Sequence, residues 1–222
     1  MSAKFGTIRH VIFDNDGVLI DSEDISMRID QQLLAGQGIV MSHAELTRRF
    51  VGKTFRAMMA EMEAERGSQF PADLEAQKDV LMIAAYRRNL QPVPGVVAAL
   101  DAIALPKSVA SNGPRDRIDI AFEITGLAKY FEGRISTFEQ VKAGKPAPDI
   151  YLLAADRAGC EPAECLVIED SPTGVTAAHA AGCRVLGFTG TAADKEIHAK
   201  TLRGLGAFAV FDDMTELPLL LA

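Results

Sequence analysis

Residues 10–23 read His-Val-Ile-Phe-Asp-Asn-Asp-Gly-Val-Leu-Ile-Asp-Ser-Glu, and this stretch decides how the chain is interpreted. The apolar residues 11–13 predict a buried strand. Asp14 and Asp16 follow this run directly, and Gly17 then allows a turn. Ligands bind at the carboxyl ends of strands in parallel α/β sheets, so we expect Asp14 to lie where ligands bind.

The two aspartates have two possible explanations at this point. Alternation along an extended segment places Asp14 and Asp16 on the same side. Two carboxylates this close repel by about 4 kcal/mol at an effective dielectric constant near 20, so they need a cation, a shared proton or both. The simpler alternative is an Asx turn that closes the strand while one aspartate caps a helix. This segment alone does not decide between a turn and a metal or phosphoryl site.

Composition favours a globular protein without a nucleic-acid or membrane partner. The chain has 222 residues, of which 48% are hydrophobic, enough for one large domain or a core with an insertion. Its net charge is −7 and it has no long basic tract, which argues against a nucleic-acid surface and a polybasic membrane patch. A small anionic substrate is still compatible with this charge, because a local basic cluster can reverse the field.

The remaining composition predicts a cytoplasmic protein. No apolar run approaches the roughly 18 residues of a membrane span, and the first residues do not resemble a signal peptide. The three cysteines lack the paired spacing of zinc ligands, and reduced thiols are typical of the cytoplasm. We expect a monomer.

From about Ser26 to Leu90 the sequence offers no convincing buried strand. It predicts four helices instead, and the second opens with a Ser-x-x-Glu capping box formed by Ser42 and Glu45. The four predicted helices cover residues 25–35, 42–50, 54–66 and 71–90.

After this block, strands and helices alternate. The predicted strands are residues 109–111, 134–137, 165–168, 185–188 and 208–211, and the predicted helices are residues 96–104, 114–125, 148–158, 173–181 and 192–202. This rhythm predicts a Rossmann-like α/β fold, with a parallel sheet and helices on both faces. The helical block is then a second domain, residues 20–91, inserted into a core of residues 1–19 and 92–222.

Four segments with polar or charged residues follow or adjoin the strands. They are the Asp14–Asp16 pair, Ser-Asn-Gly at 111–113, Lys145 in a Gly-Lys-Pro turn, and Glu-Asp-Ser at 169–171. Each segment has a simple explanation as a turn, an exposed loop or a helix start with Ser171 as its cap. All four together, in this order along the sheet, are difficult to explain as coincidence.

The four segments resemble the ordered motifs of the haloacid dehalogenase (HAD) superfamily. The resemblance rests on residues 14–22, 111–113, 144–146 and 169–171, and the helical block resembles the alpha-helical cap of one subclass. Within that subclass the chain looks most like sugar-phosphate phosphatases, including 6-phosphogluconate phosphatase, and beta-phosphoglucomutase-like proteins. The resemblance implies a Mg²⁺-dependent phosphatase that hydrolyses a small phosphorylated metabolite, a sugar or sugar-acid phosphate, through an aspartyl-phosphate.

The resemblance also implies the catalytic roles. Asp14 would be the nucleophile that attacks phosphorus. Asp16 would protonate the leaving alcohol and then deprotonate the attacking water. Lys145 would neutralise Asp14 and the transferring group. Ser111 would donate a hydrogen bond to the phosphoryl group.

The remaining implied residues bind the metal and the substrate. Mg²⁺ prefers oxygen ligands and keeps several waters. Asp14 and Asp170 would supply carboxylates, Asp16 its main-chain carbonyl, and Glu169 would hold a metal-bound water. The Asn112 amide would bind the phosphoryl group, and Gly113 belongs to the same substrate-binding loop.

A basic cluster in the helical block is a candidate for binding the rest of the substrate. Four basic residues and no acidic residue lie between positions 48 and 56. Residues 52–54, Gly-Lys-Thr, resemble the substrate-facing loop of the cap. We hypothesise that Lys53, Thr54 and Arg49 contact the substrate, and the alternative is a solvated helix face.

Three other functions compete with the phosphatase. A phosphomutase is the main alternative, but the segment 21–23 lacks the nearby histidine that mutase relatives tend to carry. Phosphonate cleavage would require a lysine that forms a Schiff base with the substrate, and Lys53 is the candidate. A receiver-like phospho-switch also uses strand-end aspartates and a lysine, but it carries its phospho-acceptor on the third strand. Asp16 argues against a true dehalogenase, which lacks this second aspartate.

Overall fold

The computed structural model describes residues 7–50 and 54–221. The chain divides into two compact units, Met1–Asp21 with Gln91–Ala222, and Ser22–Leu90. The boundaries expected from the sequence, 1–19 with 92–222 and 20–91, differ from these by one or two residues. We call the first unit the core and the second the helical unit.

The core is built on a six-stranded parallel sheet with the order β3-β2-β1-β4-β5-β6. The strands are β1 (His10–Phe13), β2 (Lys107–Ser111), β3 (Ile135–Thr137), β4 (Cys165–Glu169), β5 (Arg184–Phe188) and β6 (Ala209–Phe211). This topology confirms the predicted α/β class. The direction of strand order reverses at β1, which pairs with β2 on one side and β4 on the other, and α/β folds bind ligands at such a point.

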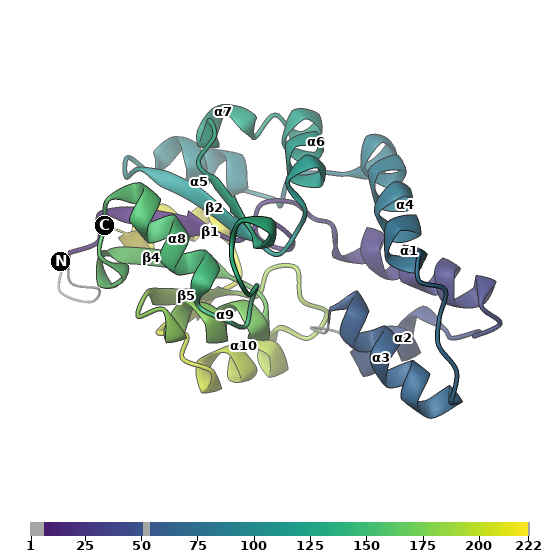
Figure 1. The fold of residues 1–222 in the computed structure, drawn as a ribbon. Helices are drawn as coiled ribbons and strands as arrows, with labels where there is room; N and C mark the ends of the chain where they lie inside the picture. Colours follow the sequence, from purple (N-terminus) through teal and green to yellow (C-terminus); the bar gives the residue numbers. More distant parts are fainter. Residues whose placement is uncertain (1–6, 51–53, 222) are drawn as a thin grey trace. The chain divides into compact units, whose positions relative to one another are not determined.

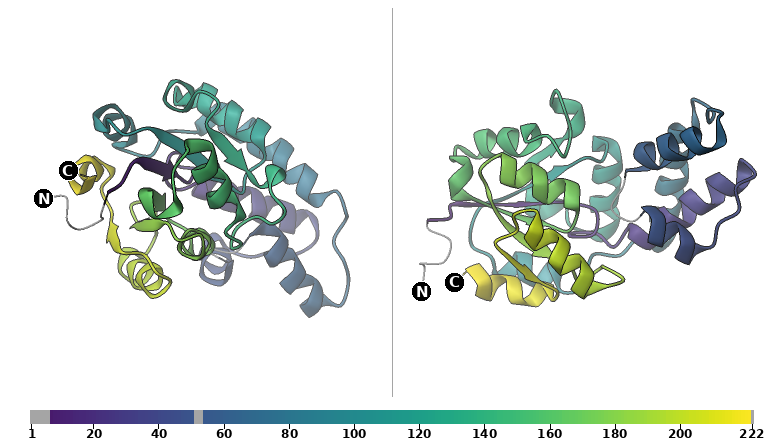
Figure 2. Two further views of the ribbon diagram at one scale, coloured as in Figure 1. Left: turned by 60° about the vertical axis from the view of Figure 1, so that its left-hand side comes forward. Right: turned by 90° about the horizontal axis from the view of Figure 1, so that it is seen from below.

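Helices cover both faces of this sheet, as Figures 1 and 2 show. They are α5 (Val96–Ala102), α6 (Arg115–Thr125), α7 (Ala128–Phe131), α8 (Asp149–Ala158), α9 (Pro172–Ala180), α10 (Lys195–Gly204) and α11 (Leu217–Leu221), with short 3₁₀ turns at Phe138–Gln140, Pro162–Glu164 and Met214–Glu216. The α8, α9 and α10 helices lie on one face, and α6 and α7 lie on the other (Figure 1).

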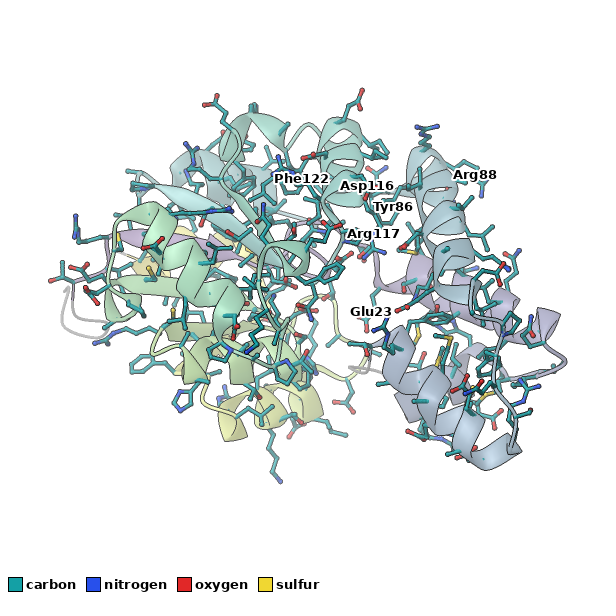
Figure 3. The ribbon with its side chains drawn as sticks, viewed as in Figure 1. Glu23, Tyr86, Arg88, Asp116, Arg117 and Phe122 are labelled. Atoms are coloured by element: carbon teal, nitrogen blue, oxygen red, sulfur yellow. The ribbon has the colours of Figure 1, made fainter. Side chains whose placement is uncertain are left out.

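Alternation along β1 sends consecutive side chains to opposite faces of the sheet. Ile12 joins the buried cluster made with α8, α9 and α10. Phe13 faces the other way and meets Phe131 edge-on, with 6.1 Å between the ring centroids. Phe122, which α6 carries (Figure 3), stacks on Phe131 at 5.3 Å. Because both faces of β1 are packed, the position of Asp14 at its end is fixed by the core.

The helical unit contains the four predicted helices, α1 (Glu23–Gly36), α2 (His43–Phe50), α3 (Phe55–Arg66) and α4 (Leu74–Asn89). Its buried side chains are mostly leucine and methionine. Tyr86, which α4 carries (Figure 3), is also buried. Ser42 Oγ accepts a hydrogen bond from the Glu45 N–H at 3.2 Å, as the capping box predicts. Asp30 and Lys78 form a buried ion pair at 2.6 Å, which joins α1 to α4.

Some helix boundaries differ from the sequence-based expectation. The helix expected from residue 192 begins at Lys195, because Asp194 caps it by accepting a hydrogen bond from the Ile197 N–H. The helix expected from residue 71 begins at Leu74. The short helices α7 and α11 were not predicted, since four or five residues are too few to show a helical period.

The two chain segments that lead to the helical unit run side by side within the core. The Asp21 N–H donates to the Gln91 carbonyl at 3.0 Å, and the Val93 N–H donates to the Leu19 carbonyl at 3.0 Å. Among the described residues, no helix has the length and apolarity needed to cross a membrane.

His10 should make the stability of the core depend on pH. Its Nε2 lies 2.8 Å from Ser108 Oγ, and burial, together with the charge of Arg134, lowers the pKa of His10 from 6.5 to about 4. Between these two pH values His10 is protonated in the unfolded chain and neutral in the folded chain. The contribution of neutral His10 to the free energy of unfolding is therefore complete above pH 6.5 and is lost as the pH falls toward 4.

We therefore expect the free energy of unfolding of the native protein to fall by about 1 kcal/mol per pH unit more than that of His10→Gln in this window. Urea denaturation at several pH values measures the difference. Parallel curves for the two proteins would contradict the assignment.

Candidate active site

A buried lysine joins two of the strand-end carboxylates. Lys145 Nζ donates to Asp14 Oδ1 at 2.6 Å and to Glu169 Oε1 at 2.7 Å. Asp14 continues the sheet beyond β1, because its N–H donates to the Ile168 carbonyl of β4 at 3.0 Å. The structure therefore brings together three residues that lie far apart in the chain, 131 positions between Asp14 and Lys145 and 24 between Lys145 and Glu169, as the motif order predicted.

Burial and the neighbouring charges shift the pKa values of Asp14 and Lys145. Burial raises the pKa of Asp14 to about 7, the Lys145 ammonium opposes this rise, and Glu169 adds to it. Burial alone would lower the pKa of Lys145, but the two carboxylates outweigh burial and raise it. Lys145 is therefore charged, and one cation faces two carboxylates. A further cation beside these carboxylates would favour the charged form of Asp14.

Glu169 is held by four hydrogen bonds. Its Oε1 accepts from Lys145 and from the Tyr151 hydroxyl at 2.8 Å, and its Oε2 accepts from the Ser171 N–H at 2.8 Å and the Ser171 hydroxyl at 3.0 Å. A Cβ at Gly174 would overlap the same carboxylate, so helix α9 can approach it only with glycine there. Ser171 also caps α9 by accepting from the Gly174 N–H, as predicted.

Asp14, Glu169 and Asp170 form an acidic cluster suited to a metal ion. One carboxylate oxygen of each lies within 4.8 Å of the others, and carboxylates are the ligands that a hard cation such as Mg²⁺ prefers. A Cβ at Gly17 would overlap the Asp170 carboxylate, and Gly17 has a φ of +78°, so glycine lets the two loops meet here. Because Glu169 already accepts four hydrogen bonds, the cluster favours Asp14 and Asp170 as direct ligands.

Contact of the Asp16 main-chain carbonyl with a metal stays a prediction. The Asp16 carboxylate accepts a hydrogen bond from the Asn15 side chain at 3.1 Å, and its exposure is intermediate.

In the Ser-Asn-Gly loop that follows β2, the Ser111 and Asn112 side chains make different contacts. Ser111 Oγ is buried and accepts from the Gly113 N–H at 3.0 Å, which leaves the hydroxyl proton available as a donor. The Asn112 side chain instead holds the backbone of Lys145: Oδ1 accepts from the Lys145 N–H at 2.9 Å and Nδ2 donates to the Lys145 carbonyl at 3.1 Å. A phosphoryl contact of Asn112 would therefore come from its main-chain N–H or from the second hydrogen of Nδ2.

Two residues near this site were not predicted from the sequence. Tyr151 lies in a helix that the pattern assigned to the core, and nothing in the pattern marks its hydroxyl. Arg117, on α6 (Figure 3), has its Nη2 3.2 Å from the position that a Cβ of Gly113 would take. The sequence around Arg117 did not mark it as a site residue, because arginines are common on the surfaces of helices.

Comparison with known proteins agrees with this geometry. Residues 8–182 match the haloacid dehalogenase-like hydrolase family. This chain belongs to that family. It is 31% identical to hexitol phosphatase A of Escherichia coli, over 79% of this chain and 80% of the relative. It is 27% identical to the E. coli 6-phosphogluconate phosphatase, over 95% of this chain and 93% of the relative.

A solved structure resembles this haloacid dehalogenase-like hydrolase over nearly its whole length. It is a conserved haloacid dehalogenase-like protein of unknown function from Agrobacterium tumefaciens, with a TM-score of 0.86 and 34% identity, covering 96% of this chain and 97% of that chain. The family assignment made from the four motifs is thereby confirmed. The two Escherichia coli relatives are phosphatases, which supports the predicted phosphoric monoester hydrolysis.

The substrate-binding residues predicted in the helical unit of the hydrolase have other contacts there. Arg49 donates to Glu61 at 3.3 Å and also binds Glu65. Thr54 Oγ1 caps α3 by accepting from the Ala57 N–H at 3.1 Å. Lys53 lies outside the described residues. Contact of Arg49, Lys53 or Thr54 with a substrate stays a prediction.

Proposed function

We propose that this hydrolase is a Mg²⁺-dependent phosphatase that hydrolyses a small sugar phosphate or sugar-acid phosphate through an aspartyl-phosphate at Asp14. The observation that carries the proposal is the position of Lys145 Nζ, 2.6 Å from Asp14 and 2.7 Å from Glu169, beside the acidic cluster with Asp170. The substrate class follows the names of the hexitol and 6-phosphogluconate phosphatases among the relatives.

The chain's own residues account for two displacement steps. A carboxylate oxygen of Asp14 attacks phosphorus, the bond from phosphorus to the substrate oxygen breaks, and Asp16 gives its proton to the leaving alcohol. Asp16 then takes a proton from water as that water attacks the same phosphorus. The bond from phosphorus to Asp14 breaks, inorganic phosphate leaves, and both aspartates return to their starting states.

Asp14 and Asp170 would hold the metal through their carboxylates and Asp16 through its main-chain carbonyl, with Glu169 bound to one metal water. When bound, Mg²⁺ supplies positive charge that lowers the pKa of Asp14 and offsets the charge of the phosphoryl oxygens. Lys145 and the Ser111 hydroxyl donate hydrogen bonds to those oxygens. This donation matters most in the transition state, where their negative charge must be stabilised.

A screen of phosphorylated metabolites, read as release of inorganic phosphate, tests the proposal. We expect release from a hexitol phosphate or 6-phosphogluconate with Mg²⁺, loss of at least about 100-fold of the rate with EDTA, and recovery when Mg²⁺ is added back. A metal-free enzyme that retained its full rate in EDTA would contradict the metal assignment. If no ester released inorganic phosphate, the phosphatase assignment would be contradicted.

A coupled assay separates the mutase alternative from the phosphatase. A mutase would convert beta-glucose 1-phosphate to glucose 6-phosphate without net release of phosphate, whereas a phosphatase would release phosphate and form no glucose 6-phosphate. The cytoplasmic location and the monomeric state stay predictions from the sequence.

A further inference from the structure

The main-chain carbonyl of Asp170 is held by a histidine from a distant helix. The parallel ladder between β4 and β5 ends at the pair Glu169 and Gly187, so the peptide after Asp170 lies beyond the regular sheet bonds. His198, on α10, places its Nε2 2.5 Å from the Asp170 carbonyl oxygen. Because a carbonyl oxygen can only accept, Nε2 must carry a proton and donate it.

The other loop of the acidic cluster is held from the same segment of the chain. Thr191 Oγ1 donates to the Gly17 carbonyl at 3.1 Å. Gly17 is the residue whose missing side chain lets the Asp14 loop meet Asp170. Residues 191–198 therefore hold the backbones of both metal-binding loops, from outside the four motifs.

This segment is itself anchored to the core. The Thr189 N–H donates to the Phe211 carbonyl of β6 at 2.9 Å, and Asp194 caps the start of α10. Lys195 Nζ pairs with Asp212 at 2.9 Å, and Leu202 buries the far end of α10 in the core cluster. An anchored segment can hold two loops at a fixed spacing, whereas a loose one cannot.

We propose that His198 is a positioning residue for the metal site, assisted by Thr191, and that it sets the distance between the Asp14 and Asp170 loops. The proposal rests on the proposed function, because it requires that the acidic cluster binds Mg²⁺. Carboxylates repel one another before the metal arrives, and fixed backbones keep them from separating. Groups that orient metal ligands without touching the metal typically change metal affinity by about 10- to 100-fold when they are removed.

The test is a calorimetric titration of Mg²⁺ into the full-length protein without substrate. We expect His198→Ala to raise the Kd for Mg²⁺ about tenfold. His198→Gln should keep the Kd within about threefold of the native value, because the glutamine Nε2 offers a donor at a similar reach. Thr191→Val, which keeps the shape of the side chain and loses its hydroxyl, should raise the Kd about threefold and covers the case in which His198→Ala does not fold.

His179→Ala is the matched control, because His179 is an exposed histidine on α9. Its Kd should equal the native value. Native affinity in both His198→Ala and Thr191→Val would overturn the proposal, as would a loss of thermal stability in these variants with no change in Kd. Absence of Mg²⁺ binding in the native protein would instead overturn the metal part of the proposed function, so the two failures are distinguishable.

Discussion

An Asp14→Asn enzyme should release phosphate at least about 10⁴-fold more slowly than the native enzyme, because an amide oxygen cannot replace a carboxylate as the nucleophile. The lower rate should come from the loss of the nucleophile and not from misfolding. The asparagine side chain has nearly the same shape, its amide oxygen can still accept from Lys145, and burial already disfavours the charge of Asp14 by raising its pKa to about 7. Stopped-flow release of p-nitrophenolate from p-nitrophenyl phosphate, with Mg²⁺ present, measures the effect.

Asp16→Asn is the informative comparison for this experiment. p-Nitrophenolate leaves without being protonated, so Asp16→Asn should still give a burst of about one equivalent as the phospho-enzyme forms. Its later turnover should be slower by about 10²- to 10⁴-fold, because no carboxylate takes the proton of the attacking water. A burst from Asp14→Asn, or turnover near the native rate, would remove Asp14 from the nucleophile position.

The fold could be predicted from the sequence because its signals are local. The apolar run at 11–13, the Ser-x-x-Glu box at Ser42 and the regular alternation after residue 94 each indicate an element within a few residues. The rule that ligands collect at strand carboxyl ends then places Asp14, Ser111 and Glu169 near one another before any coordinates are known. The role of Lys145 needed the family resemblance, since a lysine in a Gly-Lys-Pro turn has no local mark of burial.

The supporting contacts could not be predicted, because they join side chains to distant backbone. Asn112 holds Lys145 across 33 positions, and His198 holds Asp170 across 28. Tyr151 in the α8 pattern is indistinguishable from an ordinary core aromatic until the position of Glu169 is known. In the helical unit, a run of basic residues could not be assigned to a substrate from sequence, because the acidic partners of Arg49 lie one helix later.

The Lys145→Met substitution should destabilise the folded core and also inactivate the enzyme. The substitution leaves Asp14 and Glu169 buried without the cation between them, and removing one partner of a buried pair costs about 3 to 5 kcal/mol. The native ammonium holds the pKa of Asp14 down, so its loss raises that pKa further, and the carboxyl then takes up a proton on folding. The destabilisation should therefore grow as the pH rises above 7 and should shrink as the pH falls. Urea denaturation at two pH values measures both effects.

Two further variants decide whether the effect comes from unbalanced buried charge. Lys195→Met breaks an exposed ion pair of similar length with Asp212, and it should cost no more than about 1 kcal/mol. Adding Glu169→Gln to Lys145→Met removes one of the two carboxylate charges that the ammonium balanced, so the double variant should recover at least about 1 kcal/mol of the loss at pH above 7 while staying inactive. If Lys145→Met cost no more than Lys195→Met, or if the second substitution deepened the loss, the ammonium would not be balancing these carboxylates. Lys145 would then matter only to the transferring phosphoryl group.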